Sequence, residues 1–159
     1  MRKYTHTAIA IVLLALCCCD SSDLAVPEPE SMEQTGDEAL AAGLQLFLQE
    51  AAARDVPIDS DDIERLDLIA RNTPPGVLGT CRETREGRLE VVISEDLHDE
   101  ELTWTIFHEL GHCLLGMKHR DEHPSIMNTE TEMGNLAGMS RKEILDEFFQ
   151  AKFFDGALP

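Results

Sequence analysis

The sequence predicts a single small α+β domain, and three observations lead to this prediction. Apolar residues recur at the spacing of a helical face near residues 45, 106 and 147. Two short segments rich in β-branched residues lie between the first two of these stretches. No internal repeat divides the chain of 159 residues. We therefore expect a short mixed sheet packed on a central helix, with further helices towards both ends of the domain.

The first 18 residues have the pattern of a secretory leader. Arg2 and Lys3 provide a positive start, and an apolar core follows at residues 8–16. This core is shorter than the about 20 helical residues that cross a bilayer, so we expect it to direct export rather than to span a membrane.

Three consecutive cysteines follow the apolar core, and the segment resembles a bacterial lipoprotein box, in which one Cys becomes the lipidated first residue. Such boxes favour Leu three positions before that Cys and a small residue just before it. Cys19, with Leu16 and Cys18 before it, fits this pattern best. The resemblance implies a protein held by lipid in the bacterial cell envelope, at the outer membrane or the periplasmic face. The alternative is a secreted protein with an ordinary leader.

Residues 19–36 are rich in Ser, Asp, Glu and Pro and lack an apolar pattern, so we expect an acidic flexible tether. The whole chain has a formal net charge of −18, and loss of the leader with its two basic residues makes the charge −20. Such acidity argues against nucleic acid as a partner and against a basic membrane-binding face. The remaining residues, 37–159, form one domain, which we expect to be monomeric.

The domain opens with a helix predicted from Asp37 to about Arg54. Asp37 is a suitable helix cap, and Pro57 lies just beyond the predicted end. Residues 58–72 are ambiguous. Their apolar spacing suits a helix, but the alternation at residues 66–69 also suits a strand.

Two strands are predicted after the break at residues 74–76. They cover residues 77–82 and 88–94 and are joined by a turn around Glu86 and Gly87. The central helix should then begin at or near Asp99.

A last helix is predicted after a loop at residues 128–139. Ser140 and Glu143 form a capping box at its start. Its apolar face comprises Ile144, Leu145, Phe148, Phe149 and Phe153.

The central helix carries the motif His-Glu-x-x-His, beginning at His108. With 3.6 residues per turn, His108 and His112 lie one turn apart on one face, about 6 Å along the axis. Two imidazoles so placed can bind one Zn²⁺ ion, and a catalytic zinc keeps three protein ligands and a water molecule. Gly116 is suited to end the helix, and His119, three residues later, is the candidate third ligand.

Glu109 is the candidate general base. It would take a proton from the zinc-bound water and return it to the leaving amine. His-Glu-x-x-His alone is a weak motif that also occurs by chance or for structural reasons. The Gly-x-x-His and Ser-Ile-Met that follow it favour a metal site.

On these residues the chain resembles the metzincin metallopeptidases, whose signature is H-E-x-x-H-x-x-G-x-x-H followed by a methionine turn. The short step to the methionine is similar to that of the matrixin branch, and the motif also resembles small metallopeptidase-like lipoproteins of bacterial envelopes. The resemblance implies a small zincin fold with a C-terminal helix after the methionine turn. It implies zinc ligands at His108, His112 and His119, a base at Glu109, a turn at Gly116 and a methionine beneath the metal at Met127.

The chain departs from the family pattern at one point. Three residues, 113–115, separate the second His from the Gly, where the family has two. A slightly longer helix can accommodate the extra residue, and Asp121, Glu122 and His123 are alternative third ligands. Metzincin clefts also lie beside a sheet edge that pairs with extended peptide. Residues 88–94 are the candidate for that edge, or else an ordinary core strand.

Cys81 and Cys113 are the two cysteines of the domain. In an oxidising envelope they can form a disulfide, which would tie a strand to the back of the zinc helix, near Ile106 and Leu110. The alternative is two buried thiols that pack as small apolar groups.

Three functions agree with these patterns. The first is a zinc endopeptidase that acts on protein or peptide substrates. The second is a non-enzymatic zinc-binding lipoprotein, and the third is an amidase that acts on cell-wall peptides. Glu109 favours the two enzymatic functions, because a storage site has no need of a base beside its metal.

Overall fold

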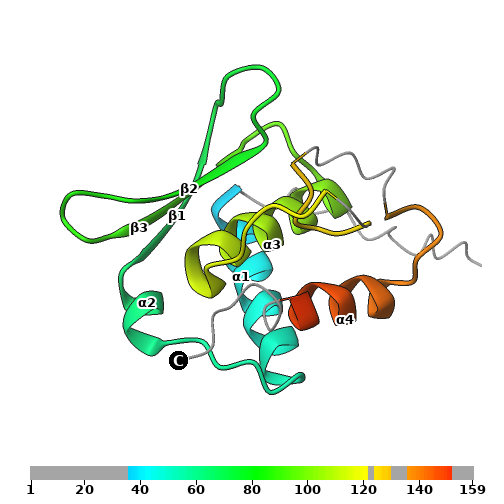
Figure 1. The fold of residues 1–159 in the computed structure, drawn as a ribbon. Coiled ribbons are helices and arrows are strands. Elements are labelled where there is room, and N and C mark those ends of the chain that lie inside the picture. The colour runs from blue at the N-terminus through cyan, green and yellow to red at the C-terminus, as the bar shows by residue number, and fades with distance from the viewer. Residues whose placement is uncertain (1–35, 122–123, 130–135, 152–159) are drawn as a thin grey trace, which may run out of the picture. The chain divides into compact units, whose positions relative to one another are not determined.

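The computed structural model describes residues 36–121, 124–129 and 136–151, which form four helices and a three-stranded sheet (Figure 1). The α+β class expected from the sequence is confirmed. The leader, Cys19 and nearly all of the predicted tether lie outside the described residues. The elements in order are α1 (Gly36–Ala52), α2 (Ser60–Glu64), β1 (Leu66–Arg71), β2 (Gly79–Glu83), β3 (Leu89–Ser94), α3 (Asp99–Leu115) and α4 (Arg141–Ala151).

Helix α1 begins and ends slightly before its predicted limits. Asp37 and Glu38 lie in its first turn, where their charges favour the positive end of the helix dipole, so Asp37 is not the residue before the helix. Its buried face includes Leu40, Phe47 and Ala51. None of the helices in the described part of the chain is long and apolar enough to cross a membrane.

The ambiguous segment at residues 58–72 contains both a helix and a strand. The short helix α2 is capped by Asp59, whose carboxylate accepts a hydrogen bond of 2.9 Å from the Asp61 amide. Strand β1 follows and pairs in parallel with β3, from Leu66 opposite Leu89 to Arg71 opposite Ser94. This pairing is a contact between residues far apart in sequence, so periodicity within the segment could not reveal it.

The sheet has the order β1-β3-β2, with β2 antiparallel to β3. The turn between β2 and β3 is closed by a hydrogen bond from the Gly87 amide to the Thr84 carbonyl, and Gly87 has a φ of 78°. Strand β3 lies in the centre with both edges paired and most of its side chains buried. The suggestion that residues 88–94 pair with a peptide is therefore wrong, and β1 and β2 are the edges of this sheet.

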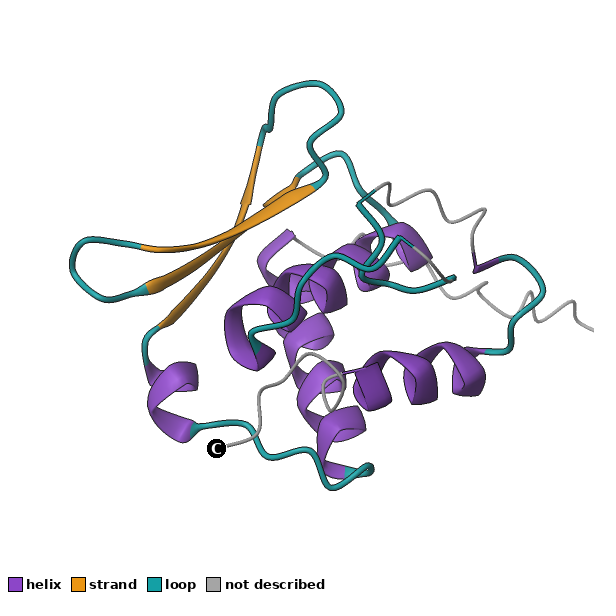
Figure 2. Cartoon of the chain, viewed as in Figure 1, coloured by secondary structure: helices purple, strands orange, loops and turns teal. Residues whose placement is uncertain are grey.

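Helix α3 packs against the sheet and against the helices α1 and α4, and α1 also contacts β1 (Figures 1 and 2). Phe47 of α1, Phe107 of α3, and Phe148 and Phe149 of α4 form an aromatic cluster in which each side chain is at most 1% exposed. The ring centroids of Phe47 and Phe107 are 5.2 Å apart, and those of Phe107 and Phe148 are 5.8 Å apart. Burial of these rings fixes α3 in place, because aromatic side chains contribute large apolar areas to a core.

The capping box of α4 forms as the sequence predicts. The Ser140 amide donates to the Glu143 carboxylate at 2.7 Å, and the Glu143 amide donates to Ser140 Oγ at 3.3 Å. The apolar face of α4 includes Ile144, Leu145 and the two phenylalanines of the aromatic cluster, while Phe153 lies outside the described residues.

Cys81 of β2 and Cys113 of α3 form a disulfide, with an S–S distance of 2.04 Å and a Cα–Cα distance of 5.8 Å. The disulfide interpretation of the two cysteines therefore holds, and the buried-thiol alternative does not. This bond links the edge strand covalently to the motif helix across 32 positions of sequence.

Replacing both cysteines, as Cys81→Ala with Cys113→Ala, should lower the free energy of unfolding by about 3–4 kcal/mol, because the unfolded chain gains the freedom of an open loop. Urea denaturation of the parent and the double variant measures the difference. The parent in reductant should match the variant. A difference below about 0.5 kcal/mol would show that the link contributes nothing to stability.

Candidate metal centre

Helix α3 and the turn after it bring three histidines together. His108 and His112 lie one turn apart on α3, which ends at Leu115. Gly116 follows in the left-handed conformation, with φ 63° and ψ 22°, and the Met117 amide donates to the Gly111 carbonyl at 3.0 Å. The chain then turns back and brings His119 beside the other two histidines. The extra residue between His112 and Gly116 is thus accommodated by the length of the helix.

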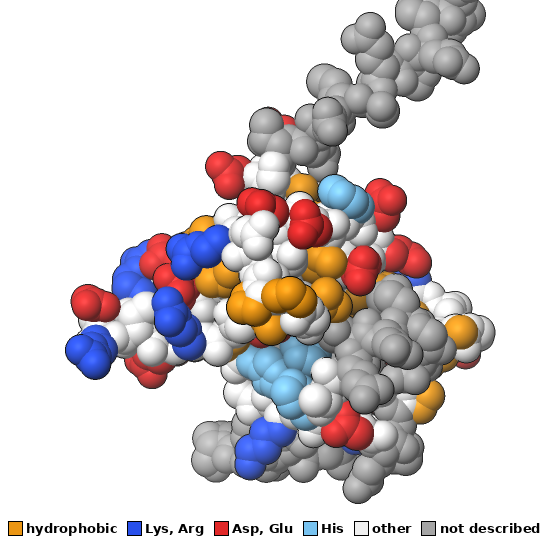
Figure 3. Space-filling view, turned by 90° about the horizontal axis from the view of Figure 1, so that it is seen from above, with side chains coloured by type: hydrophobic (Ala, Val, Ile, Leu, Met, Phe, Trp, Pro, Cys, Tyr) orange, Lys and Arg blue, Asp and Glu red, His pale blue; other side chains and the backbone are white. Residues whose placement is uncertain are grey.

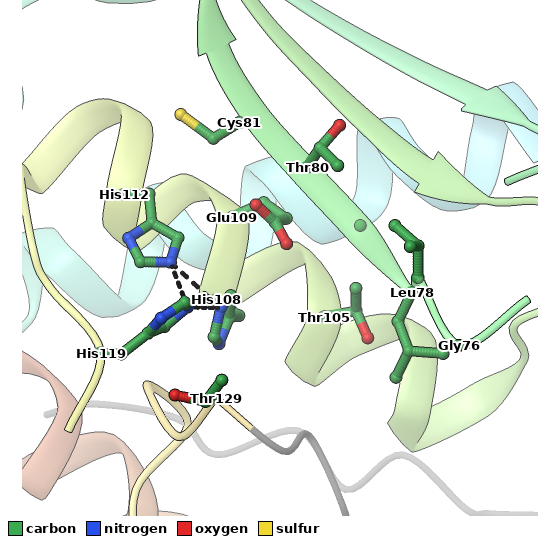
Figure 4. Close-up of a pocket in the computed structure, with 12 residues that line it drawn as sticks. Gly76, Leu78, Thr80, Cys81, Thr105, His108, Glu109, His112, His119 and Thr129 are labelled. Carbon is green, nitrogen blue, oxygen red and sulfur yellow. Dashed lines mark hydrogen bonds between the residues drawn. The ribbon is translucent and has the colours of Figure 1, made fainter. Parts of the chain in front are cut away.

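The Nε2 atoms of the three histidines form a nearly equilateral triangle (Figure 4). The Nε2 atom of His112 is 3.1 Å from that of His108 and 3.1 Å from that of His119, and the third side is 3.3 Å. Two nitrogen ligands of a tetrahedral zinc ion, each about 2.0–2.1 Å from the metal, are about 3.3 Å apart. The cluster can therefore hold one metal ion of this size.

The tautomers of two histidines point to the same conclusion. His108 Nδ1 lies 2.7 Å from the carbonyl oxygen of Ile126, and His112 Nδ1 lies 2.7 Å from that of Met117. A carbonyl oxygen only accepts, so both Nδ1 atoms carry hydrogen and donate it. In the neutral rings, both Nε2 atoms then present lone pairs to each other at 3.1 Å. Such an arrangement is repulsive unless a cation lies between the rings, which is the usual arrangement of metal-binding histidines.

Burial keeps the imidazoles of His108 and His112 neutral. His108 is 4% exposed, and burial lowers its pKa to about 4, against a smaller opposing effect of its bond to Ile126. Burial also lowers the pKa of His112. His119 is exposed and closes the cluster from the solvent side. Neutral imidazole is the form that binds metal, so the two helical residues are ready to do so at neutral pH.

The segment that contains Met127, the predicted methionine turn, contacts the histidine cluster through His108. Residues 125–128 form a turn closed by a 3.3 Å hydrogen bond from the Asn128 amide to the Ser125 carbonyl. Its Ile126 carbonyl holds His108, and the Met127 side chain is fully buried. A Cβ atom on Gly111 would be only 2.8 Å from Met127 Sδ, so a glycine in the motif helix makes room for the methionine.

Helix α4 fixes this turn from the other side. Glu147 accepts a 2.9 Å hydrogen bond from Ser125 Oγ and lies 3.7 Å from the guanidinium of Arg120. The Arg120 amide in turn donates to the Met127 carbonyl at 2.9 Å. These contacts join the loop that carries His119 to the methionine turn, and both of them to α4.

The alternative third ligands take no part in the cluster as far as the structure describes them. Asp121 accepts hydrogen bonds from the amide and the hydroxyl of Thr129, at 2.7 and 2.9 Å. Glu122 and His123 lie outside the described residues. Of the candidates, His119 is the one that the structure brings to the other two histidines.

Glu109 and the three histidines line one cleft of about 380 Å³, a size suited to a small ligand or a peptide segment. Residues 76–81 form one wall, Thr105 contributes from α3, and Thr129 contributes from the position just after the turn of residues 125–128 (Figure 4). Figure 3 shows the histidines gathered at the surface beside an apolar patch, with acidic side chains farther out. The candidate metal centre is therefore accessible from outside.

Glu109 is buried although it lines the cleft. Its side chain is 6% exposed, and burial raises its pKa to about 7. A carboxyl group with such a pKa exchanges a proton easily near neutral pH.

The disulfide lies on another side of α3 than the sequence predicted. Cys81 lines the cleft, so the disulfide lies along the cleft and not at the back of the helix. Trp104 and Leu115, near the metal face in sequence, are buried in the hydrophobic core and are not among the cleft residues.

Thr105, Thr129 and Gly79 are cleft residues that the sequence analysis missed. Thr105 precedes Glu109 by one helical turn, so helical periodicity could have found it. Thr129 and Gly79 belong to segments whose position depends on tertiary packing, and no local pattern marks them.

Comparison of the chain with protein-family models, with curated proteins and with solved structures found no match. The structure itself supports a metal site formed by His108, His112 and His119. The resemblance to the metzincins and the choice of zinc as the metal rest on the sequence motif alone.

Replacing any one of the three histidines by Ala should lower the affinity for Zn²⁺ by at least about 100-fold, because two nitrogen ligands leave the ion half coordinated. Isothermal titration with Zn²⁺ and metal content after dialysis measure this loss. His98→Ala is the matched control, since His98 is exposed and stands before α3. An unchanged affinity in His119→Ala would exclude His119 as the third ligand.

The metal-free protein should show a pH-dependent stability that depends on Glu109. The pKa of Glu109 is raised from 4.5 to about 7 in the folded state, so the folded state binds its proton more tightly than the unfolded state does. The contribution of Glu109 is therefore present below about pH 4.5 and is lost as the pH rises through about 7.

We expect the free energy of unfolding of the parent to fall by a few kcal/mol relative to that of Glu109→Gln over this range. Urea denaturation of both proteins in chelator gives the difference. His108, whose pKa is lowered to about 4, contributes in the opposite direction, but it is present in both proteins and cancels. A difference that does not vary with pH would contradict the raised pKa.

Proposed function

We propose that this protein is a zinc-dependent metallopeptidase in which Glu109 acts as the general base. The observation that carries the proposal is the presence of a buried carboxyl group in the same accessible cleft as three converging imidazoles. A bound zinc ion would lower the pKa of a coordinated water and polarise the carbonyl of the scissile bond. Three nitrogen ligands and an open cleft favour zinc over metals that prefer oxygen ligands.

The residues of the chain would act as follows. The imidazoles of His108, His112 and His119 would hold the ion, with two of them oriented by backbone carbonyls. Glu109 would accept a proton from the attacking water and then donate it to the nitrogen of the leaving amine. The base thus returns to its starting state, and one water molecule is consumed for each peptide bond. A pKa near 7 suits both steps, because neither protonation state is strongly favoured at neutral pH.

An extended peptide or protein segment is the substrate that we propose. Strand β2 is an edge of the sheet, and its residues 79–81 line the cleft. The unpaired backbone groups of an edge strand can bind an extended peptide as an added strand. The amidase alternative would use the same base and metal on cell-wall peptides, so a substrate screen distinguishes the two.

The proposed location is the bacterial cell envelope, with the protein anchored by lipid at Cys19. This part of the proposal rests on the sequence of the first 36 residues alone: a leader, a lipoprotein-like box and an acidic tether. The disulfide between Cys81 and Cys113 is in keeping with an oxidising compartment.

Glu109→Gln should retain zinc but lose peptide cleavage by a factor on the order of 10²–10⁴, because the amide cannot accept the proton of the attacking water. Cleavage of a peptide library and of a denatured protein, with zinc content measured in parallel, tests this. Glu101→Gln, an exposed position in the first turn of the same helix, is the control and should cleave like the parent. Equal rates for Glu109→Gln and the parent would refute the mechanism. Zinc binding without any cleavage by the parent would favour the non-enzymatic zinc-binding function.

A further inference from the structure

Strand β2 lies along the face of α3 that carries Glu109 and Cys113. Successive side chains of a strand point to opposite faces, so Gly79 and Cys81 share one face of β2, and Thr80, which is exposed, lies on the other. The disulfide holds Cys81 of β2 next to Cys113 of α3. Glu109 precedes Cys113 by one helical turn, about 6 Å, and Gly79 precedes Cys81 by about 7 Å of strand. Because the disulfide fixes how β2 is aligned along α3, Gly79 lies beside Glu109.

The backbone of Gly79 approaches the Glu109 side chain very closely. A Cβ atom on residue 79 would lie 2.7 Å from Glu109 Cγ, 2.8 Å from Oε1 and 3.0 Å from Cδ. Carbon atoms in contact prefer a separation of about 3.5–4.0 Å, so no other residue fits there without movement. Gly79 is not among the glycines with positive φ, so its backbone conformation is one that other residues adopt. What requires glycine at this position is space.

We infer that Gly79 is a positioning residue for Glu109. The missing side chain of Gly79 leaves a slot between β2 and α3 that receives the Glu109 carboxyl group, and the Cys81–Cys113 bond holds β2 in the register that keeps this slot over the base. The slot also accounts for a carboxyl group that is buried at the wall of an open cleft. The effect of Gly79 on catalysis rests on the proposed function, whereas the slot that Gly79 leaves for Glu109 does not.

Gly43 provides a matched comparison within the same molecule. A Cβ atom there would lie 2.5 Å from Ile106 Cδ1, an equally close approach between α1 and α3. That contact is purely apolar and belongs to the core. An added methyl group at residue 43 should therefore destabilise the fold without any dependence on Glu109.

A double-mutant cycle on the metal-free protein tests the slot. Gly79→Ala should lower the folding equilibrium constant by at least about tenfold in the parent, and by less than about twofold once Glu109→Ala has emptied the slot. Gly43→Ala should lower it equally in both backgrounds. If the single variant Gly79→Ala fails to fold, folding of the double variant Gly79→Ala with Glu109→Ala supports the slot as well. An equal effect of Gly79→Ala in both backgrounds, or a double variant that does not fold, overturns the inference.

Cleavage kinetics of the zinc-loaded protein test whether Gly79 positions Glu109 for catalysis. Gly79→Ala should keep its zinc and show a kcat lower by a factor on the order of 10², with KM changed less than about threefold, because a displaced base affects the reaction more than binding. Gly36→Ala is the control for added methyl groups, since its Cβ would meet Ala70 Cβ at an ordinary 3.6 Å. An unchanged kcat in Gly79→Ala overturns the positioning role. Absence of cleavage by the parent refutes the proposed function. The double-mutant cycle on stability then tests by itself whether Gly79 leaves a slot for Glu109.

Discussion

The candidate metal centre depends on one buried hydrogen bond, from His108 Nδ1 to the carbonyl oxygen of Ile126. This bond fixes the tautomer of the first histidine and turns its Nε2 lone pair towards the other two rings. It also joins α3 to the turn of residues 125–128, whose position α4 secures through Glu147 and Ser125. Because the acceptor is a backbone carbonyl, the bond depends on the path of the chain more than on the identity of residue 126.

The same burial has opposite effects on the two kinds of ionisable group in the cleft. It lowers the pKa of His108 to about 4 and raises that of Glu109 to about 7. In each case the charged form is disfavoured, because the protein solvates charge less well than water does. The result is that two neutral imidazoles, those of His108 and His112, lie in the same cleft as a carboxyl group that is easily protonated. Strand β2 contributes to the burial of Glu109, because the backbone of Gly79 lies close to its side chain.

Two glycines allow the elements around α3 to approach it closely. Gly111 leaves room for the Met127 sulfur beside α3, and Gly79 leaves room for the Glu109 carboxyl group beside β2. In both cases the useful property is the absence of a side chain rather than a special backbone conformation. The disulfide between Cys81 and Cys113 links the second contact covalently to the motif helix.

The features that could be predicted from the sequence are those that are local in the chain. The spacing of His108 and His112, the helix end at Gly116 and the capping box of Ser140 and Glu143 follow from periodicity and backbone preference within a few residues. The motif alone also named His119 as a candidate. Whether its ring reaches the other two was decided by the turn of the chain after the helix.

Long-range contacts determine which strand lies in the centre of the sheet, which side of α3 carries the disulfide, and which residues complete the cleft. Strand β3 is central because it pairs with β1 on one side and β2 on the other, and neither pairing leaves a signal in the sequence of β3 itself. Gly79 and Thr129 reach the site through such long-range contacts. Contacts of this kind form when separate apolar surfaces are buried together, so they depend on the whole core and not on any local pattern.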